Sequence, residues 1–247
     1  PKIQPKYPIY IISKGRWTTR QTSKALELMD VDYKIVIEPQ EYDNYVKYIS
    51  PDKIITLPFS NLGQGSIPAR NFVWLHSIKA GFKKHWILDD NILSFKRYHL
   101  NYKCKLDSGV FFKIIEDFTE RFKNVKISGP HYTYFFPQNK TTAPPITLNS
   151  RIYSTLLLDN SLYPDFKWRG KYNEDTDLSL RVLKAGFATI LFNGFLQDKT
   201  TTMTMKGGNE ELYKNGREPF VDSLVQQHPD VVKKVFKFNR IHHSVDY

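Results

Sequence analysis

Three consecutive side chains with oxygen ligands, Asp89, Asp90 and Asn91, directly follow a short apolar run at residues 85–88. Carboxylate and amide oxygens are the ligands that Mg²⁺ and Mn²⁺ prefer, and these ions readily bridge to phosphates. Ligands also bind at the ends of strands in open α/β sheets. Asp and Asn are ordinary turn residues, however, so the triplet alone is more typical of a polar turn than of a metal site.

A second acidic cluster contains Glu174, Asp175 and Asp177 at the start of a predicted helix. A helix N-terminus stabilises negative charge, so we expect these carboxylates to be ionised near neutral pH, as a general base must be. Capping of the helix explains acidic residues here equally well. Trp168 and Arg169, just before the cluster, are either a core aromatic and a surface charge or a platform for an acceptor.

Two further segments carry groups that bind anions or metals. A glycine-bearing turn at residues 63–67 enters a predicted helix that has Arg70 in its first turn, an arrangement able to hold phosphate. It matches neither the Walker loop nor the dinucleotide fingerprint. His242 and His243 are either part of a frayed terminal tail, which is the commoner case, or ligands of a metal site.

The elements that must position these residues alternate along the chain. Apolar runs at residues 7–13, 33–38, 53–57 and 85–89 predict strands that alternate with helical patterns, including a helix at 68–80. This alternation predicts a parallel sheet with helical crossovers. An amphipathic stripe at 108–122 predicts a helix packed on the sheet. Further strands are expected at 125–129 and 147–153, an aromatic loop or hairpin at 131–145, and helices at 175–185 and 219–227.

Composition favours a single globular domain in a reducing compartment. The chain has 247 residues, one cysteine (Cys104) and no long apolar run, so we expect no internal disulfide and a soluble cytoplasmic protein. Its 36 basic against 25 acidic residues give a net charge of +11. That charge favours a polyanionic partner such as nucleic acid, but a generally basic surface explains it as well.

Taken in order along the chain, these segments resemble the GT-A glycosyltransferases. The resemblance is closer to the phage-type TET-associated glycosyltransferases, which modify 5-hydroxymethylcytosine in DNA. It spans nearly the whole chain and is carried by residues 7–16, 37–41, 63–71, 85–91, 168–181, 206–209 and 242–247. Several long motifs in one order are far more specific than any one of them.

The resemblance implies a fold, a donor site and a metal. The fold would be α/β, a single GT-A domain over residues 1–247 with a central, mostly parallel mixed sheet flanked by helices. Residues 1–100 would bind a nucleotide-sugar, expected to be UDP-linked, and residues 101–247 would bind the acceptor and catalyse. A divalent ion, Mn²⁺ or Mg²⁺, would be held by Asp90, Asn91, His242 and His243, where Asn91 departs from the simple D-x-D pattern. The implied donor-binding residues are Ser13, Lys14, Gly15, Arg16, Glu38, Gln64, Gly65, Arg70, Asn71 and Asp89.

The resemblance also implies the chemistry. Asp175, with Glu174, would act as the general base of an inverting transfer to the hydroxyl of 5-hydroxymethylcytosine in DNA. Trp168, Arg169 and Lys206 would contact the acceptor, and the aromatic segment at 132–136 would receive a base extruded from the duplex. Two other classes fit the residues: a metal-dependent nuclease or phosphotransferase acting on DNA, and a nucleic-acid-binding module without catalysis.

Overall fold

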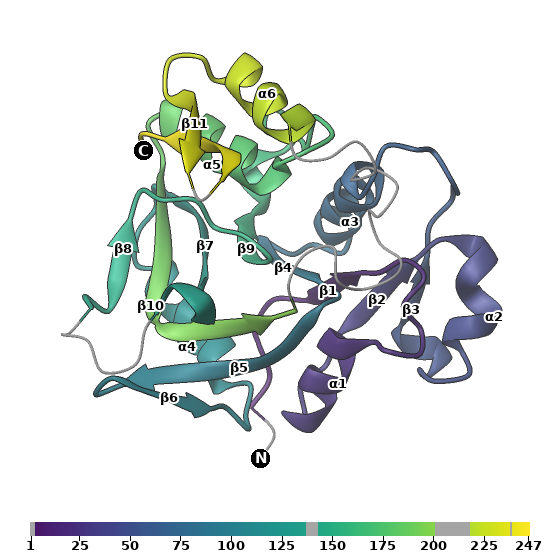
Figure 1. Ribbon diagram of the computed structural model, residues 1–247. Helices are drawn as coiled ribbons and strands as arrows, with labels where there is room; N and C mark the ends of the chain where they lie inside the picture. Colours follow the sequence, from purple (N-terminus) through teal and green to yellow (C-terminus); the bar gives the residue numbers. More distant parts are fainter. Residues whose placement is uncertain (1–2, 137–142, 201–217, 238) are drawn as a thin grey trace.

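A large mixed sheet forms the centre of the protein (Figure 1). The computed structural model describes residues 3–136, 143–200, 218–237 and 239–247. The order of strands in the sheet is β3-β2-β1-β4-β9-β7-β10-β5-β6, and β8 also pairs with β10. The strands are β1 (Ile9–Ile12), β2 (Lys34–Ile37), β3 (Ile54–Thr56), β4 (Lys84–Asp89), β5 (Ile92–His99), β6 (Tyr102–Lys105), β7 (Val125–Tyr132), β8 (Ile146–Leu148), β9 (Thr155–Asp159) and β10 (Ala188–Lys199).

Helices flank this sheet, so the predicted α/β class is confirmed. They are α1 (Gln21–Leu28), α2 (Tyr42–Tyr45), α3 (Ile67–Lys79), α4 (Val110–Thr119), α5 (Glu174–Lys184) and α6 (Glu218–Gln227). Short 3-10 turns join them: η1 (Pro39–Glu41), η2 (Pro51–Lys53), η3 (Thr133–Phe135) and η4 (Asn160–Leu162). Among the described residues, no helix is both long and apolar enough to cross a membrane.

The first four strands form the parallel part of the sheet. β1 pairs in parallel with β2 and β4, and β2 pairs in parallel with β3, as the alternation of strands and helices predicted. Parallel strands end at the same edge of a sheet. Ser13, Glu38 and Asp90, which directly follow β1, β2 and β4, therefore lie along one edge.

The remaining strands are largely antiparallel. The strand predicted at 125–129 is confirmed in β7, whereas β5, β6 and β10 were not predicted. β9 is antiparallel to both β4 and β7, whereas β10 is parallel to β7 and antiparallel to β5 and β8. The single strand predicted at 147–153 is wrong, because β8 ends at Leu148 and β9 begins at Thr155. β5 lies between β10 and β6, so the sheet is continuous across the predicted division at residue 100.

Side chains of the central strands alternate between two layers of core. Trp86 and Leu88 of β4 pack with α1 and α4 on one face, while Ile87 packs with α3 and α5 on the other. The predicted amphipathic stripe is confirmed in α4, where Phe111 and Phe112 are fully buried. The strands that carry the site residues are therefore packed between two buried layers.

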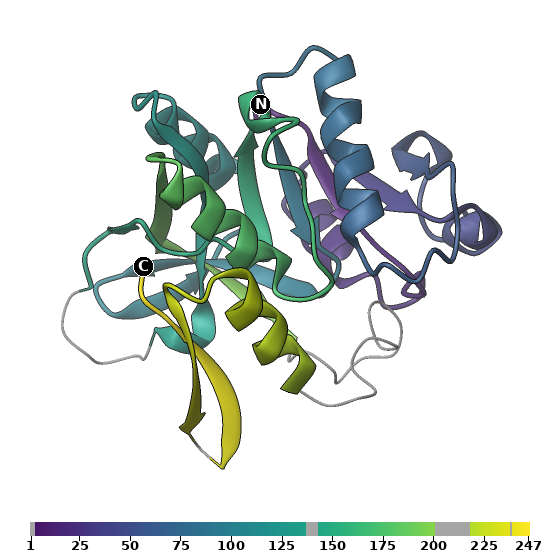
Figure 2. The ribbon, with the colours of Figure 1, turned by 90° about the horizontal axis from the view of Figure 1, so that it is seen from above.

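The C-terminal residues form a separate two-stranded hairpin. β11 (Val232–Lys237) pairs antiparallel with β12 (Arg240–Val245), and α6 packs beside them (Figures 1 and 2). His242 and His243 lie within β12, so the frayed terminal tail considered above is not what the structure shows.

Candidate active site

Asp90 is held at the end of β4 by residues that follow β1. Its side chain accepts a hydrogen bond from Ser13 Oγ at 2.8 Å and pairs with the guanidinium of Arg16. Tyr45 is a buried residue of α2, and its hydroxyl oxygen lies 2.6 Å from Ser13 Oγ. The same hydroxyl accepts a hydrogen bond from the Arg16 backbone N–H. Burial raises the pKa of Asp90, although Arg16 and Ser13 oppose that shift.

Two positively charged side chains, Arg70 and Lys199, bind the carboxylate of Asp89. Arg70 Nη2 lies 2.8 Å from its Oδ1, and Lys199 Nζ, at the end of β10, lies 2.6 Å from its Oδ2. Burial alone would raise the pKa of Asp89, but Lys199 and Arg70 together hold that pKa well below its usual range. Asp89 is therefore ionised throughout the physiological pH range.

Arg70 connects Asp89 with the start of α5. Its Nη2 lies 3.5 Å from Glu174 Oε1 and its Nη1 lies 3.8 Å from Asp175 Oδ1. Ser66 strengthens this junction because its Oγ accepts a bond from Arg70 Nε at 3.0 Å and donates one to Glu174 Oε1 at 3.3 Å. One buried guanidinium thus joins the two acidic clusters found in the sequence.

Asp175 is mostly buried, and its Oδ1 accepts no hydrogen bond from the described residues. Its side chain is 18% exposed, and its Oδ2 accepts a hydrogen bond from the Ser154 backbone N–H at 3.2 Å. Burial raises the pKa of Asp175 to about 7, since the opposing effect of Arg70 is offset by Glu174 and Asp89. The expectation of full ionisation near neutral pH is therefore corrected: desolvation outweighs the helix N-terminus. A carboxyl group with this pKa is well suited to accept a proton at neutral pH.

The third acidic residue of α5 has a different environment. Asp177 is 1% exposed and binds Arg169 Nη2 at 2.9 Å, Arg181 Nε at 2.8 Å and His228 Nε2 at 2.8 Å. Burial opposes ionisation, but Arg169, Arg181 and His228 hold the pKa of Asp177 below its usual value. Asp177 therefore anchors α5 rather than facing Arg70.

A family comparison identifies the kind of enzyme. The family model of the TET-associated glycosyltransferases (TAGT) matches residues 7–208, which includes the strand ends, Arg70, Asp89 and the start of α5. The chain belongs to this family. It is a glycosyltransferase. No curated protein matches the chain.

Solved structures resemble the glycosyltransferase in fold. One is glucosyl-3-phosphoglycerate synthase from Mycobacterium tuberculosis, in complex with Mg²⁺ and UDP. It superposes with a TM-score of 0.55 at 10% sequence identity, and the match covers 97% of this chain and 87% of the synthase chain. A putative nucleotide-diphospho-sugar transferase from Desulfovibrio desulfuricans G20 gives a TM-score of 0.46 at 8% identity over 91% of this chain and 98% of that one. The first similarity shows the GT-A type of fold.

Several predicted donor-binding residues lie beside Asp90 in the glycosyltransferase. Lys14 Nζ lies 3.1 Å from Glu38 Oε2, so the residues after β1 and β2 are in contact. Gly15 has a φ of 68°, a left-handed conformation that favours glycine, and its N–H bonds to the Glu41 carboxylate at 2.9 Å. Gln64 and Gly65, in contrast, are exposed in the turn before α3.

Asn71 and Trp168, both predicted to bind substrates, contact each other and the core of the glycosyltransferase. Asn71 exchanges two hydrogen bonds with the Trp168 backbone, at 2.9 and 3.0 Å. Trp168 is only 2% exposed, and its ring lies 4.8 Å from the Arg70 guanidinium carbon. Trp168 therefore backs Arg70 within the core instead of presenting a face on which an acceptor could stack. Arg169 is half-exposed while paired with Asp177.

The predicted metal ligands are only partly brought together in the glycosyltransferase. Asn91 Oδ1 is buried and accepts no hydrogen bond from the residues that the structure describes. Each Asp90 oxygen accepts one bond and keeps capacity for another contact. Mg²⁺ is commonly held by one or two protein oxygens plus substrate phosphates, so Asp90 and Asn91 fit such an ion.

The terminal histidines and Asp90 form no metal-binding group of three among the described residues. Within the described part of the chain, no three His, Cys, Asp or Glu side chains are grouped closely enough to hold a metal, so Asp90, His242 and His243 do not form such a group. Burial and the charge of Arg151 lower the pKa of His243 to about 4. The predicted acceptor-binding residue Lys206 lies outside the described residues.

Sequence reasoning missed two groups at the centre of the glycosyltransferase site. Lys199 binds both Asp89 and, at 2.8 Å, Ser154 Oγ, while Ser154 also holds Asp175 through its backbone. The available signal was the mostly apolar segment at 188–196, which predicts a strand and would have placed Lys199 near a strand end.

Proposed function

We propose that this glycosyltransferase moves a sugar from a nucleotide-sugar, expected to be UDP-linked, to the hydroxymethyl oxygen of 5-hydroxymethylcytosine in DNA. The observation that carries the proposal is the placement of Asp175 and Asp89 on two sides of the buried Arg70 guanidinium. A carboxylate able to accept a proton thus lies beside a strand edge that binds donors in this type of fold. The DNA acceptor is an inference from the family and from the net charge of +11.

The donor is proposed to lie along the ends of β1, β2 and β4. Ser13, Lys14 and Glu38 would contact its nucleoside, and Arg16 and Arg70 its diphosphate. Asp90 and Asn91 would hold Mg²⁺ or Mn²⁺. That ion would neutralise charge on the leaving diphosphate when bound. The Mg²⁺ and UDP bound to the similar mycobacterial synthase support this placement.

Residues of the chain would accept the proton of the acceptor hydroxyl and stabilise the negative charge of the leaving diphosphate. Asp175 takes the proton from the acceptor hydroxyl while the hydroxyl oxygen forms a bond to the anomeric carbon of the sugar. The bond from that carbon to the diphosphate breaks, and its electron pair stays on the phosphate oxygen. Arg70 and Lys199 lie next to Asp89, where they stabilise the negative charge that develops. A single displacement of this kind inverts the anomeric configuration.

An aromatic shelf beside the site would receive the acceptor base. It consists of Tyr132, Tyr134 and Phe135, whose ring centroids are 5.6 to 6.4 Å apart, with Tyr134 83% exposed. The Tyr132 hydroxyl donates to the Lys199 carbonyl at 3.2 Å, so the shelf adjoins the residue that binds Asp89. An extruded base needs a stacking surface, and Trp168 is too deeply buried to provide one.

The test is nucleoside mass spectrometry of 5-hydroxymethylcytosine DNA incubated with a panel of nucleotide-sugars and Mn²⁺ or Mg²⁺. We expect one sugar-sized increment per modified base with at least one donor, and none with Asp175→Asn. The absence of any sugar adduct, together with nicked DNA in reactions without donor, would replace this proposal with the nuclease alternative.

A further inference from the structure

The C-terminal hairpin β11–β12 presents one face that is strongly basic. Residues directly opposite each other in an antiparallel pair lie on the same face of the sheet, and successive residues alternate between faces. The pairs Lys233 with Ser244 and Lys237 with Arg240 therefore lie on one face. Lys233, Lys237 and Arg240 are exposed, and none of them forms an ion pair within the described residues.

The opposite face fixes the hairpin to the body of the protein. Val232 is 1% exposed and packs with Leu224 of α6 and Leu180 of α5. On the same face, Lys234 Nζ lies 2.6 Å from Asp222 and 3.2 Å from Glu218, both on α6. At Val232 and Lys234 this face is covered by α6, so the basic face points away from α6 there.

The far end of the hairpin adds an exposed aromatic ring. Phe236 is 70% exposed and close to the end of β11, and by the same alternation it lies on the face of Val232 and Lys234, opposite the basic face. In Figure 2 the hairpin, drawn in yellow, points away from the central sheet. No acidic residue occurs between 232 and 245, so the whole projection carries positive charge.

The near end of the hairpin adjoins the catalytic helix. Val245 of β12 packs against the hydrophobic cluster that contains Leu180 of α5, the helix whose first turn holds Asp175. The hairpin therefore extends outward from α5, the helix that carries Asp175. A partner bound along the hairpin would be continuous with the reacting base.

We propose that the β11–β12 hairpin is a docking element for double-stranded DNA next to the modified base. A two-stranded β-ribbon fits the major groove of B-DNA, and Lys and Arg side chains neutralise its phosphates. With the ribbon inside the groove, Phe236 at its far end, exposed on the opposite face, would contact the base stack, as apolar side chains do in proteins that distort DNA. The inference rests on the proposed function, since it assigns the contact surface for that acceptor.

The test measures binding of a 5-hydroxymethylcytosine duplex by fluorescence anisotropy across a series of KCl concentrations. The variant carries Lys233→Gln, Lys237→Gln and Arg240→Gln. Each lost phosphate contact lowers the slope of log Kd against log salt by about 0.9, so we expect the slope to fall by about 2.7. A charge-preserving variant with Lys233→Arg, Lys237→Arg and Arg240→Lys should keep the wild-type slope.

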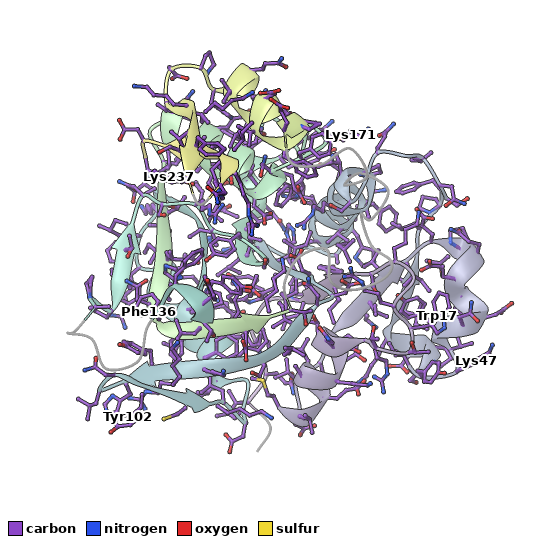
Figure 3. All side chains as sticks on the ribbon, in the orientation of Figure 1. Trp17, Lys47, Tyr102, Phe136, Lys171 and Lys237 are labelled. Atoms are coloured by element: carbon purple, nitrogen blue, oxygen red, sulfur yellow. The ribbon has the colours of Figure 1, made fainter. Side chains whose placement is uncertain are left out.

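The matched control removes the same charge elsewhere, by Lys47→Gln, Lys79→Gln and Lys83→Gln. These lysines are exposed, and Lys47 lies on the side of the molecule opposite Lys237 in Figure 3. The control should bind with the wild-type slope. Equal slopes for the hairpin variant and the control would overturn the inference.

Two further readouts separate the docking role from the enzyme's activity. Phe236→Ala should lower kcat/KM for the duplex more than for a single strand of the same sequence, because a single strand requires no unstacking within a duplex. An equal effect on the two substrates would contradict the assigned contact with the base stack. Sugar transfer by the wild type tests the proposed function separately, so failure of one proposal is distinguishable from failure of the other.

Discussion

Arg70 Nη1 lies 3.8 Å from Asp175 Oδ1, and the other end of the same guanidinium, Nη2, is bonded to Asp89 at 2.8 Å. The Arg70 side chain is 4% exposed, so its charge acts on both carboxylates with little screening by water. This single side chain therefore couples the residue proposed to take the acceptor proton with the edge of the sheet proposed to bind the donor.

Replacing Arg70 by Gln should shift the pH dependence of transfer. Arg70 lowers the pKa of Asp175, so its removal should move the acidic limb of the kcat/KM profile to higher pH. Removing one partner of a buried ion pair should also cost about 3 to 5 kcal/mol of stability. Initial rates from pH 5.5 to 9 and denaturant unfolding measure the two effects. An acidic limb that stays in place would show that Asp175 does not control it.

Replacing Asp175 by Asn should abolish transfer but leave donor binding intact. In the wild type, kcat/KM should rise with pH through about 7 as Asp175 loses its proton. The loss in the variant should be roughly 10²- to 10⁴-fold, the usual contribution of a general base. Calorimetric titration with the nucleotide-sugar is the control, and a variant that keeps the wild-type rate would exclude Asp175 as the base.

The same substitution should stabilise the protein above pH 7. The folded-state pKa of Asp175 lies near 7, above its ordinary value, so the native state binds the extra proton and stability falls as pH rises from about 4 to about 7. Asn removes this cost, which is up to about 4 kcal/mol at pH 8 because each pKa unit corresponds to about 1.4 kcal/mol. Urea unfolding at pH 5 and pH 8 should show a larger gain at pH 8. A gain of equal size at both pH values would contradict the raised pKa.

Replacing Asp177 by Ala should destabilise the fold. Its carboxylate is buried against Arg169, Arg181 and His228, and removal of such a partner costs about 3 to 5 kcal/mol. Its folded-state pKa is lowered, so its stabilisation is present above an unfolded-state value of about 4 and is lost as pH falls through the lower folded value. Tm measured at pH 7 should drop clearly, and Asp117→Ala, at an exposed position on α4, should leave it nearly unchanged.

Replacing Tyr134 by Ala should weaken acceptor binding alone. A stacked base contributes about 1 to 3 kcal/mol, so KM for the DNA should rise roughly 5- to 150-fold while KM for the nucleotide-sugar stays constant. Steady-state kinetics with each substrate varied in turn separate the two constants. Tyr48→Ala, another exposed tyrosine, is the matched control. Equal changes for both substrates would place the aromatic shelf outside the acceptor site.

Chelation should stop the reaction, and Asn91→Ala should raise the metal concentration needed to restore it. Asn91 Oδ1 is buried without a hydrogen-bond donor among the described residues, so its removal costs little stability unless the oxygen binds an ion. Titration of EDTA-treated enzyme with Mn²⁺ or Mg²⁺ gives the half-activating concentration. Asn44→Ala on α2 serves as the control. Unchanged half-activation in Asn91→Ala would remove this residue from the metal site.

The sequence by itself determined the parallel part of the fold and the chemical character of the site. Apolar runs followed by Ser13, Glu38 and Asp90 predicted strand ends, and parallel pairing necessarily brings such ends to one edge. The helix beginning at Glu174 was equally readable, because its apolar spacing and acidic first turn are local patterns.

Only the tertiary structure decided which of those residues meet. The contact of Lys199 with Asp89 joins residues 110 positions apart through the antiparallel pairing of β10 and β5, which no local pattern specifies. Asp175 and Asp177 are chemically alike and two residues apart, but one faces Arg70 and the other faces Arg181 and His228. Their pKa values shift in opposite directions because desolvation and neighbouring charge, rather than residue type, determine them.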